Sequence, residues 1–274
     1  MNERILIIGG DKRQQYLEKF LKDNGKDVFH LKYPADISEI AEITDYSHII
    51  MPLPISKDKE YVYSSDNISL RIDDVISQIK PCHCVFASGL DNKVLDYFED
   101  NGIEYHDFMK DKIFKRANAY LTAQGTLRLL LENTEDYVIG KKALIIGFGD
   151  VADTLAELLS EIGVDVYITA RNLRKLSLAG YSGYNMIELN DIESRINFFD
   201  YIFGTVPVNI LSETAVKNIS DNSVYTELAS YPYNADKAYF DKYNKKYLNG
   251  SALPGRYLPV ASGRIMAEFI LSKL

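Results

Sequence analysis

The sequence lacks the features that mark membrane, secretory and nucleic-acid-binding proteins. No apolar run reaches the roughly 18 residues that a helix needs to span a bilayer. The apolar stretch near the N-terminus is short and has no small-residue cleavage site, so we expect no signal peptide. The net charge is −8 without a dense stripe of lysine or arginine, which argues against a nucleic-acid surface. We therefore expect a cytoplasmic protein with no membrane and no nucleic-acid partner.

Cysteine is scarce, and tryptophan is absent. The two cysteines, Cys82 and Cys84, flank His83 at the head of an apolar segment. We interpret them as reduced thiols, because a zinc site takes about four ligands and His83 alone does not complete that set. The sequence therefore predicts no metal.

What the sequence does contain is a repeated alternation of short β-branched runs and amphipathic helical patterns. This alternation is typical of parallel α/β sheets. In the first part of the chain, strands are expected at residues 4–9, 27–32, 47–53, 84–89 and 103–108. In the second part, they are expected at residues 142–147, 165–171, 184–189, 201–206, 223–229 and 246–252.

A break in the alternation indicates how the chain is divided. A charged stretch at residues 110–120 is followed by a helical pattern with Leu127, Leu130 and Leu131 on one face. We predict an α/β fold of two Rossmann-like, doubly wound parallel-sheet domains joined by a helix, with the C-terminal helix packing back on the first domain. The expected domains are residues 1–120 together with 255–274, and residues 121–254.

The segment ALIIGFGDVA carries a variant of the dinucleotide fingerprint, with Gly147, Gly149 and Ala152 at the three small positions. The first glycine permits a tight turn, the second lets the backbone approach a pyrophosphate, and the third position keeps the helix close to the strand. The strand, glycine turn, helix and second strand follow one another in the order that the motif requires. The alternative is a tight turn that binds nothing.

The end of the second strand distinguishes NADP(H) from NAD(H). An acidic residue there would bind the ribose hydroxyls of NAD, but the chain has Arg171 and Asn172, with Arg174 and Lys175 close behind. A guanidinium favours a 2′-phosphate, so the pattern predicts NADP(H). A solvated basic helix start is the alternative.

Other cofactor contacts are expected in the glycine turn and after the later strands. These residues are Asp150, Val151, Thr205, Val206, Pro207, Leu228 and Ala229. The Asp150 carboxylate suits the dipole of an empty helix but competes with a bound anion. It therefore favours, as an alternative function, a catalytically silent nucleotide-binding or scaffold subunit.

Several segments, taken in order, resemble one known family. They are GGDKRQ after the first strand, AxxTAQG in the connecting helix, GKKALIIGFG with its ITAR strand end, ELAS at 227–230 and LPGRYLPVASGRI near the C-terminus. Over essentially the whole chain, this series is similar to the A subunits of bacterial dipicolinate synthase.

The resemblance implies a substrate-side domain followed by an NADP-binding Rossmann domain, as in 2-hydroxyacid dehydrogenases. It implies NADP-dependent oxidation of dihydrodipicolinate to dipicolinate in the mother cell of a sporulating bacterium, alongside a B subunit. We also expect a homo-oligomer. The chain departs from the family's pattern at four positions, which leaves the substrate open: Leu121, Gln124, Asp150 and Val260. A reductase acting on another small carboxylic acid is the enzymatic alternative.

Oxidation of a small dicarboxylate needs groups that bind its carboxylates and place the reacting carbon against the nicotinamide. Cations and helix N-termini serve that purpose. The expected substrate-binding residues are Arg13, Ser88, Thr122, Gln124 and Arg256. Arg13 follows an IIGG turn that lacks the third small residue, and a plain surface charge is its alternative role. No general base stands out, and His106 beside Asp107 is the candidate.

Overall fold

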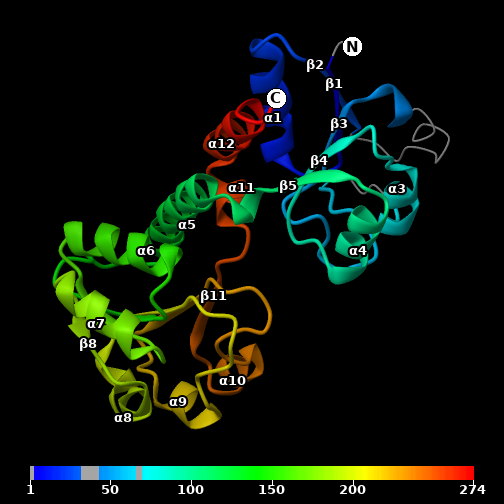
Figure 1. The fold of residues 1–274 in the computed structure, drawn as a ribbon. Coiled ribbons are helices and arrows are strands. Elements are labelled where there is room, and N and C mark those ends of the chain that lie inside the picture. The colour runs from blue at the N-terminus through cyan, green and yellow to red at the C-terminus, as the bar shows by residue number, and fades with distance from the viewer. Residues whose placement is uncertain (1–2, 32–42, 66–69) are drawn as a thin grey trace. The chain divides into compact units, whose positions relative to one another are not determined.

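The computed structural model describes residues 3–31, 43–65 and 70–274 (Figure 1). The chain forms two compact units: unit 1 contains residues 1–118 and 258–274, and unit 2 contains residues 119–257. Among the described residues, we find no helix with the length and apolar character of a transmembrane segment.

Within the described residues, unit 1 is built on a five-stranded parallel sheet in the order β2-β1-β3-β4-β5. Its strands are β1 (Arg4–Ile8), β2 (Asp27–Leu31), β3 (His48–Ile50), β4 (Cys84–Ala87) and β5 (Glu104–Asp107). Its helices are α1 (Lys12–Asp23), α3 (Ile72–Gln78), α4 (Asn92–Asp100) and α12 (Pro259–Leu271).

The inner strands β1, β3 and β4 are largely apolar and are buried on both faces, whereas the edge strands β2 and β5 carry polar and exposed residues. Ile5 and Ile7 pack with side chains of α1 and α12, whereas Leu6 and Ile8 pack with side chains of α3 and α4. Since successive side chains of a strand point to opposite faces, one run of isoleucine and leucine supplies both cores.

The C-terminal helix α12 packs back on α1 within unit 1, as predicted (Figure 1). Gly263 makes the close approach possible. A Cβ atom at this position would lie 2.7 Å from the Arg13 carbonyl oxygen and 2.8 Å from the Leu17 amide nitrogen. Helix packing therefore explains why the SGRI motif has a glycine.

Replacing Gly263 by alanine will destabilise unit 1, because the new methyl group meets main-chain atoms of α1. Overpacking of this kind costs about 1–3 kcal/mol. Urea unfolding should show this loss, while Gly149→Ala, where an added Cβ meets nothing within 4 Å, should unfold like the wild type. Equal stability of the two variants would contradict the packing role of Gly263.

Within the described residues, unit 2 holds a six-stranded parallel sheet in the order β11-β10-β9-β6-β7-β8. Its strands are β6 (Lys142–Ile146), β7 (Asp165–Thr169), β8 (Asn185–Met186), β9 (Tyr201–Gly204), β10 (Val224–Glu227) and β11 (Lys246–Asn249). Counted from β6, this is the 3-2-1-4-5-6 order of dinucleotide-binding folds.

Helix α5 (Lys112–Glu132) spans the boundary between the units. The other helices of unit 2 are α6 (Asp150–Glu161), α7 (Leu173–Tyr181), α8 (Ile192–Arg195), α9 (Glu213–Asn218), α10 (Lys237–Lys242) and α11 (Leu253–Tyr257).

The predicted fold class is confirmed, with local corrections. The charged stretch at 110–120 is no break, because α5 already begins at Lys112. Leu131 is 49% exposed, whereas Leu130 is buried, so the apolar face of α5 is narrower than predicted. The strand expected at 27–32 is described as far as Leu31, and Lys32 lies outside the described residues.

Candidate functional site

A pocket of about 250 Å³ lies in unit 2 at the carboxyl ends of β6, β7 and β9. Strands β6 and β9 are neighbours in the sheet although they are not consecutive in the chain. Their junction is the point where the strand order reverses, and open α/β sheets bind ligands in the crevice outside it. The topology therefore marks this pocket as the candidate site.

The glycine turn after β6 forms one wall of the pocket. Gly147 has a φ of +112°, and a Cβ atom there would lie 2.5 Å from Val206 Cγ1 and 2.6 Å from Thr205 Oγ1. Gly149 is the N-cap residue of α6, has extended backbone angles and has no atom within 4 Å of an added Cβ. The first glycine is thus required by the fold, whereas the second only keeps the space beside the helix N-terminus open.

The end of β7 supplies the positive charge of the pocket. Arg171 and Lys175 are exposed and line it. Asn172 caps α7, since its side-chain oxygen accepts hydrogen bonds from the amides of Arg174 (3.0 Å) and Lys175 (3.3 Å). This cap starts α7 directly after the strand and so places Lys175 on the pocket side.

The third wall, after β9, is fixed by hydrogen bonds. The Thr205 hydroxyl donates to the Ile146 carbonyl at 2.8 Å, which ties this loop to the end of β6. The buried Asn234 side chain donates to the carbonyls of Val206 (2.6 Å) and Val208 (2.7 Å).

Asn234 is held in turn by a buried carboxylate. Glu227, at the end of β10, is 2% exposed. Its carboxylate accepts hydrogen bonds from the Tyr225 hydroxyl (2.7 Å) and from the backbone amides of Asn234 (2.8 Å) and Ala229 (3.0 Å). Burial raises the pKa of the Glu227 carboxyl, although these donors oppose the shift. The glutamate of the ELAS segment therefore orders the loops around the pocket from within.

Glu227→Gln should lower the free energy of unfolding by about 1–3 kcal/mol, because a glutamine amide group cannot accept all the hydrogen bonds that the carboxylate accepts. The variant should also remove a pH dependence. The pKa of Glu227 is higher in the folded protein than in the unfolded chain. At pH values between these two pKa values, the folded protein therefore keeps a proton on Glu227 that the unfolded chain has released. Wild-type stability thus falls as pH rises through this window, and the variant lacks this slope. Urea unfolding at several pH values measures both effects, and Glu157→Gln, at an exposed position, is the control. If the free energy of unfolding depended on pH in the same way in the wild type and in Glu227→Gln, the raised pKa of Glu227 would be contradicted.

The structure brings together about half of the predicted cofactor residues. Those lining the pocket are Gly147, Gly149, Arg171, Asn172, Thr205 and Val206. The pocket lining does not include Asp150, Val151, Arg174, Pro207, Leu228 or Ala229. Thr169 also lines the pocket and was not predicted, although its position at a strand end could have indicated it. Lys175, which the sequence indicated only as a basic residue close behind Arg171, lines the pocket as well.

The predicted substrate residues of unit 1 are engaged inside that unit. Arg13 is 5% exposed; its guanidinium pairs with Asp11 at 2.9 Å and donates to the Leu53 carbonyl at 2.7 Å. This pairing, with the hydrogen bonds to Arg13, lowers the pKa of Asp11 against the opposing effect of burial. The Ser88 hydroxyl donates to Asp107 at 2.8 Å and links the ends of β4 and β5.

The other three predicted substrate residues belong to unit 2. Thr122 and Gln124 lie half-buried on α5, whose Gly125 approaches Leu253 so closely that an added Cβ would be 2.8 Å from its Cβ. Arg256 is exposed and donates to the Asn249 carbonyl at 2.9 Å. The AxxTAQG and LPGRY segments thus meet through Gly125 and Leu253.

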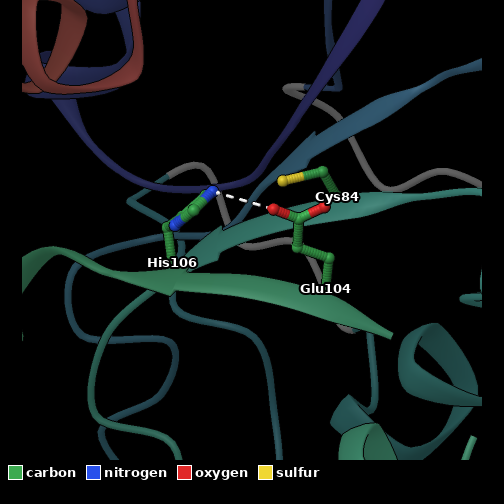
Figure 2. A group of neighbouring side chains, drawn as sticks. All are labelled: Cys84, Glu104 and His106. Atoms are coloured by element: carbon green, nitrogen blue, oxygen red, sulfur yellow. Dashed lines mark ion pairs between the residues drawn. The ribbon is translucent and has the colours of Figure 1, made fainter. Parts of the chain in front are cut away.

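His106, the candidate base, lies in β5 and is paired with Phe86 of β4. Its ring contacts the ring of Phe86 at 5.2 Å between centroids, and its Nε2 lies 3.4 Å from Glu104. The structure therefore places His106 in a group with Glu104 and Cys84 (Figure 2).

The residues of the pocket fit the phosphates of a dinucleotide. Gly149 leaves room for a phosphate beside the N-terminus of α6, where amide groups of the first helical turn have no intrahelical partner. The Thr169 hydroxyl is buried and has no hydrogen-bond partner among the described residues. Arg171 and Lys175 supply the cations that an additional phosphate requires.

Comparison with protein families also gives one match in each of the two units of the chain. Residues 4–109 match the family of N-terminal domains from the A subunit of dipicolinate synthase. Residues 118–252 match the NAD binding domain of S-adenosyl-L-homocysteine hydrolase.

Individual proteins give the same result over the full length. The dipicolinate synthase A subunit of Bacillus subtilis is 26% identical over 290 aligned residues, covering 99% of this chain and 95% of the relative. The crystal structure of the corresponding protein from Bacillus halodurans superposes with a TM-score of 0.84 at 20% identity, covering 100% of this chain and 98% of the other. D-lactate dehydrogenase of Escherichia coli shares the fold, with a TM-score of 0.67 at 12% identity and coverages of 98% and 94%. The resemblance that the sequence motifs indicate is thereby confirmed: over 99% of its length, this chain is similar to a dipicolinate synthase A subunit.

Proposed function

We propose that the protein is an NADP-dependent oxidoreductase that converts dihydrodipicolinate to dipicolinate during sporulation. The observation that carries the cofactor part is the pocket of unit 2, where Arg171 follows the end of β7 in place of an acidic residue and Lys175 lies in the first turn of α7. The substrate part is supported by the relationship to the dipicolinate synthase A subunits.

In this proposal, unit 2 holds the cofactor through groups of three kinds. The amides at the start of α6 bind the pyrophosphate, and Gly149 leaves the space for it. Arg171 and Lys175 bind the 2′-phosphate. The loop at Thr205 and Val206 forms the wall against which the nicotinamide side of the cofactor rests.

The reaction removes one hydride and one proton from the substrate and leaves an aromatic ring. The bound nicotinamide supplies the hydride acceptor. Aromatisation drives the reaction, so the chain's own residues need chiefly to bind and orient a dicarboxylate. We retain Thr122, Gln124 and Arg256 as candidates for this binding, and we propose that Arg13 and Ser88 position the loops of unit 1 that they bond.

Three residues favour other functions. Val260 is 41% exposed and uncharged where the family's pattern has lysine, and Gln124 replaces a glutamate; both favour a reductase acting on another small acid. Asp150 at the start of α6 favours a nucleotide-binding subunit without catalysis.

The deciding assay is reduction of NADP by the purified protein with freshly generated dihydrodipicolinate, with and without the B subunit. We expect substrate-dependent formation of NADPH, and we expect Gly149→Ala to reduce it without unfolding the protein. NADPH binding without turnover of this substrate would point to the reductase, and absence of NADPH binding would point to the silent subunit.

A further inference from the structure

Three side chains that commonly bind metals converge on one face of the unit 1 sheet, whereas the pocket described above belongs to unit 2. They are Cys84 of β4 and Glu104 and His106 of β5 (Figure 2). One ligand atom from each lies within 4.8 Å of the ligand atoms of the other two.

The register of the sheet, and not a loop, brings these residues together. Cys84 and Glu104 are paired residues of two parallel strands, and Glu104 and His106 are two positions apart on one strand. Side chains related in these two ways point to the same face of a sheet. The three ligands therefore stand on a rigid framework, as a metal site requires.

Packing fixes two of the ligands and leaves the third adjustable. Cys84 is half-buried against the core shared with α1 and α12, and the ring of His106 lies 5.2 Å from that of the buried Phe86. The Glu104 side chain is 70% exposed and already lies 3.4 Å from His106 Nε2. A rotation of this carboxylate can close the set around an ion without disturbing the core.

We propose that Cys84, Glu104 and His106 bind a divalent transition-metal ion of the zinc type. A sulfur, a nitrogen and an oxygen ligand suit zinc and cobalt, whereas magnesium and calcium prefer oxygen alone. Three protein ligands leave a fourth position for water.

The ion would replace a proton on Cys84. A metal-bound cysteine is a thiolate, so the thiol releases its proton to solvent as the sulfur–metal bond forms.

The position of the cluster argues for a role outside the hydride-transfer step. Cys84 and Glu104 are the first residues of β4 and β5, whereas Ser88 and Asp107 mark the carboxyl ends of these strands. Open α/β sheets bind their substrates at the carboxyl ends. The ion would instead join the first residues of β4 and β5 to His106, which follows Glu104 by two positions on β5.

The test is a titration of the reduced, metal-free full chain with Co²⁺, followed by visible and near-ultraviolet absorption. We expect one ion per chain with a thiolate-to-cobalt charge-transfer band that Zn²⁺ abolishes. Cys84→Ala should lose the band, and His106→Ala and Glu104→Gln should weaken binding by about tenfold or more. Cys82→Ala, which removes an exposed thiol two residues away, is the matched control and should retain the band.

Each result decides the proposal. Circular dichroism of the metal-free variants verifies their folding, and the exposed Glu104 guarantees one variant that leaves the core untouched. Any of three results would overturn the proposed metal site. They are the absence of a thiolate band in the wild type, a band that survives in Cys84→Ala, and unchanged cobalt affinity in Glu104→Gln. An ordinary Glu104–His106 ion pair without a metal gives the first of these results. NADPH binding is independent of all of them, so this proposal and the proposed function fail separately.

Discussion

Gly149→Ala will weaken NADPH binding roughly 10- to 100-fold while leaving the stability of the protein unchanged. No atom lies within 4 Å of the added Cβ in the structure, and the backbone of Gly149 is extended, so alanine fits the free protein. A phosphate at the N-terminus of α6 would meet the new methyl group, and a steric cost of about 1–3 kcal/mol corresponds to this loss of affinity. Titration by NADPH fluorescence measures it.

The neighbouring glycine provides the contrast. Gly147→Ala would place a methyl group against Thr205 and Val206 at a positive φ, so this variant should lose stability as well as binding. Ser160→Ala, exposed near the end of α6, serves as the neutral control. If Gly149→Ala bound NADPH as tightly as the wild type, the phosphates would not lie at this turn.

Arg171→Ala will convert a preference for NADPH into near-equal binding of NADPH and NADH. Hydrogen bonds to charged groups contribute about 1.5–3 kcal/mol, which corresponds to roughly 10- to 150-fold in the dissociation constant. The loss should concern NADPH alone, because NADH has a hydroxyl where NADPH has the 2′-phosphate. Isothermal titration with both cofactors measures the ratio.

Arg174 offers the matched control for this experiment. It is also an exposed arginine in the same short segment, but it does not line the pocket. Arg174→Ala should change NADPH affinity by no more than about threefold, since an exposed charge acts weakly through solvent. Equal losses for NADPH and NADH in Arg171→Ala would remove the 2′-phosphate assignment.

The parts of the fold that depend on local rules could be predicted from the sequence. Continuous β-branched runs alternating with amphipathic helices indicated parallel sheets, and the confirmed fold contains them. The turn at Gly147 could be predicted, because a glycine directly after a buried strand is typical of a tight turn. In the structure, Gly147 has a φ of +112° and contacts the next loop so closely that a side chain would not fit. Asn172 carries a similar local signal, since asparagine before a helical pattern is a typical cap.

Features that depend on distant partners could not be predicted in the same way. The sequence shows Arg13 at a helix start, but only the fold reveals that the Leu53 carbonyl, 40 residues away, accepts its hydrogen bond. Gly263 belongs to a segment that resembles a family motif, and its packing against α1 becomes apparent only when the helices are placed.

The metal-binding candidates illustrate the same limit. Cys84 and Glu104 are 20 positions apart in the chain, and nothing local to either residue indicates the other. Their proximity follows from the pairing of β4 with β5 in one particular register, and a shift by one residue would turn Glu104 and His106 to the opposite face. For this reason the sequence suggested only His83 as a partner of the cysteines.

The most direct test of the account is a crystal structure of the protein grown with NADPH. We predict that the pyrophosphate accepts hydrogen bonds from backbone amides at the start of α6, that Gly149 lies against it, and that Arg171 contacts the 2′-phosphate. An empty pocket, or one filled by the side chain of Asp150 with NADPH present, would contradict the assignment of this protein as an NADP-dependent oxidoreductase.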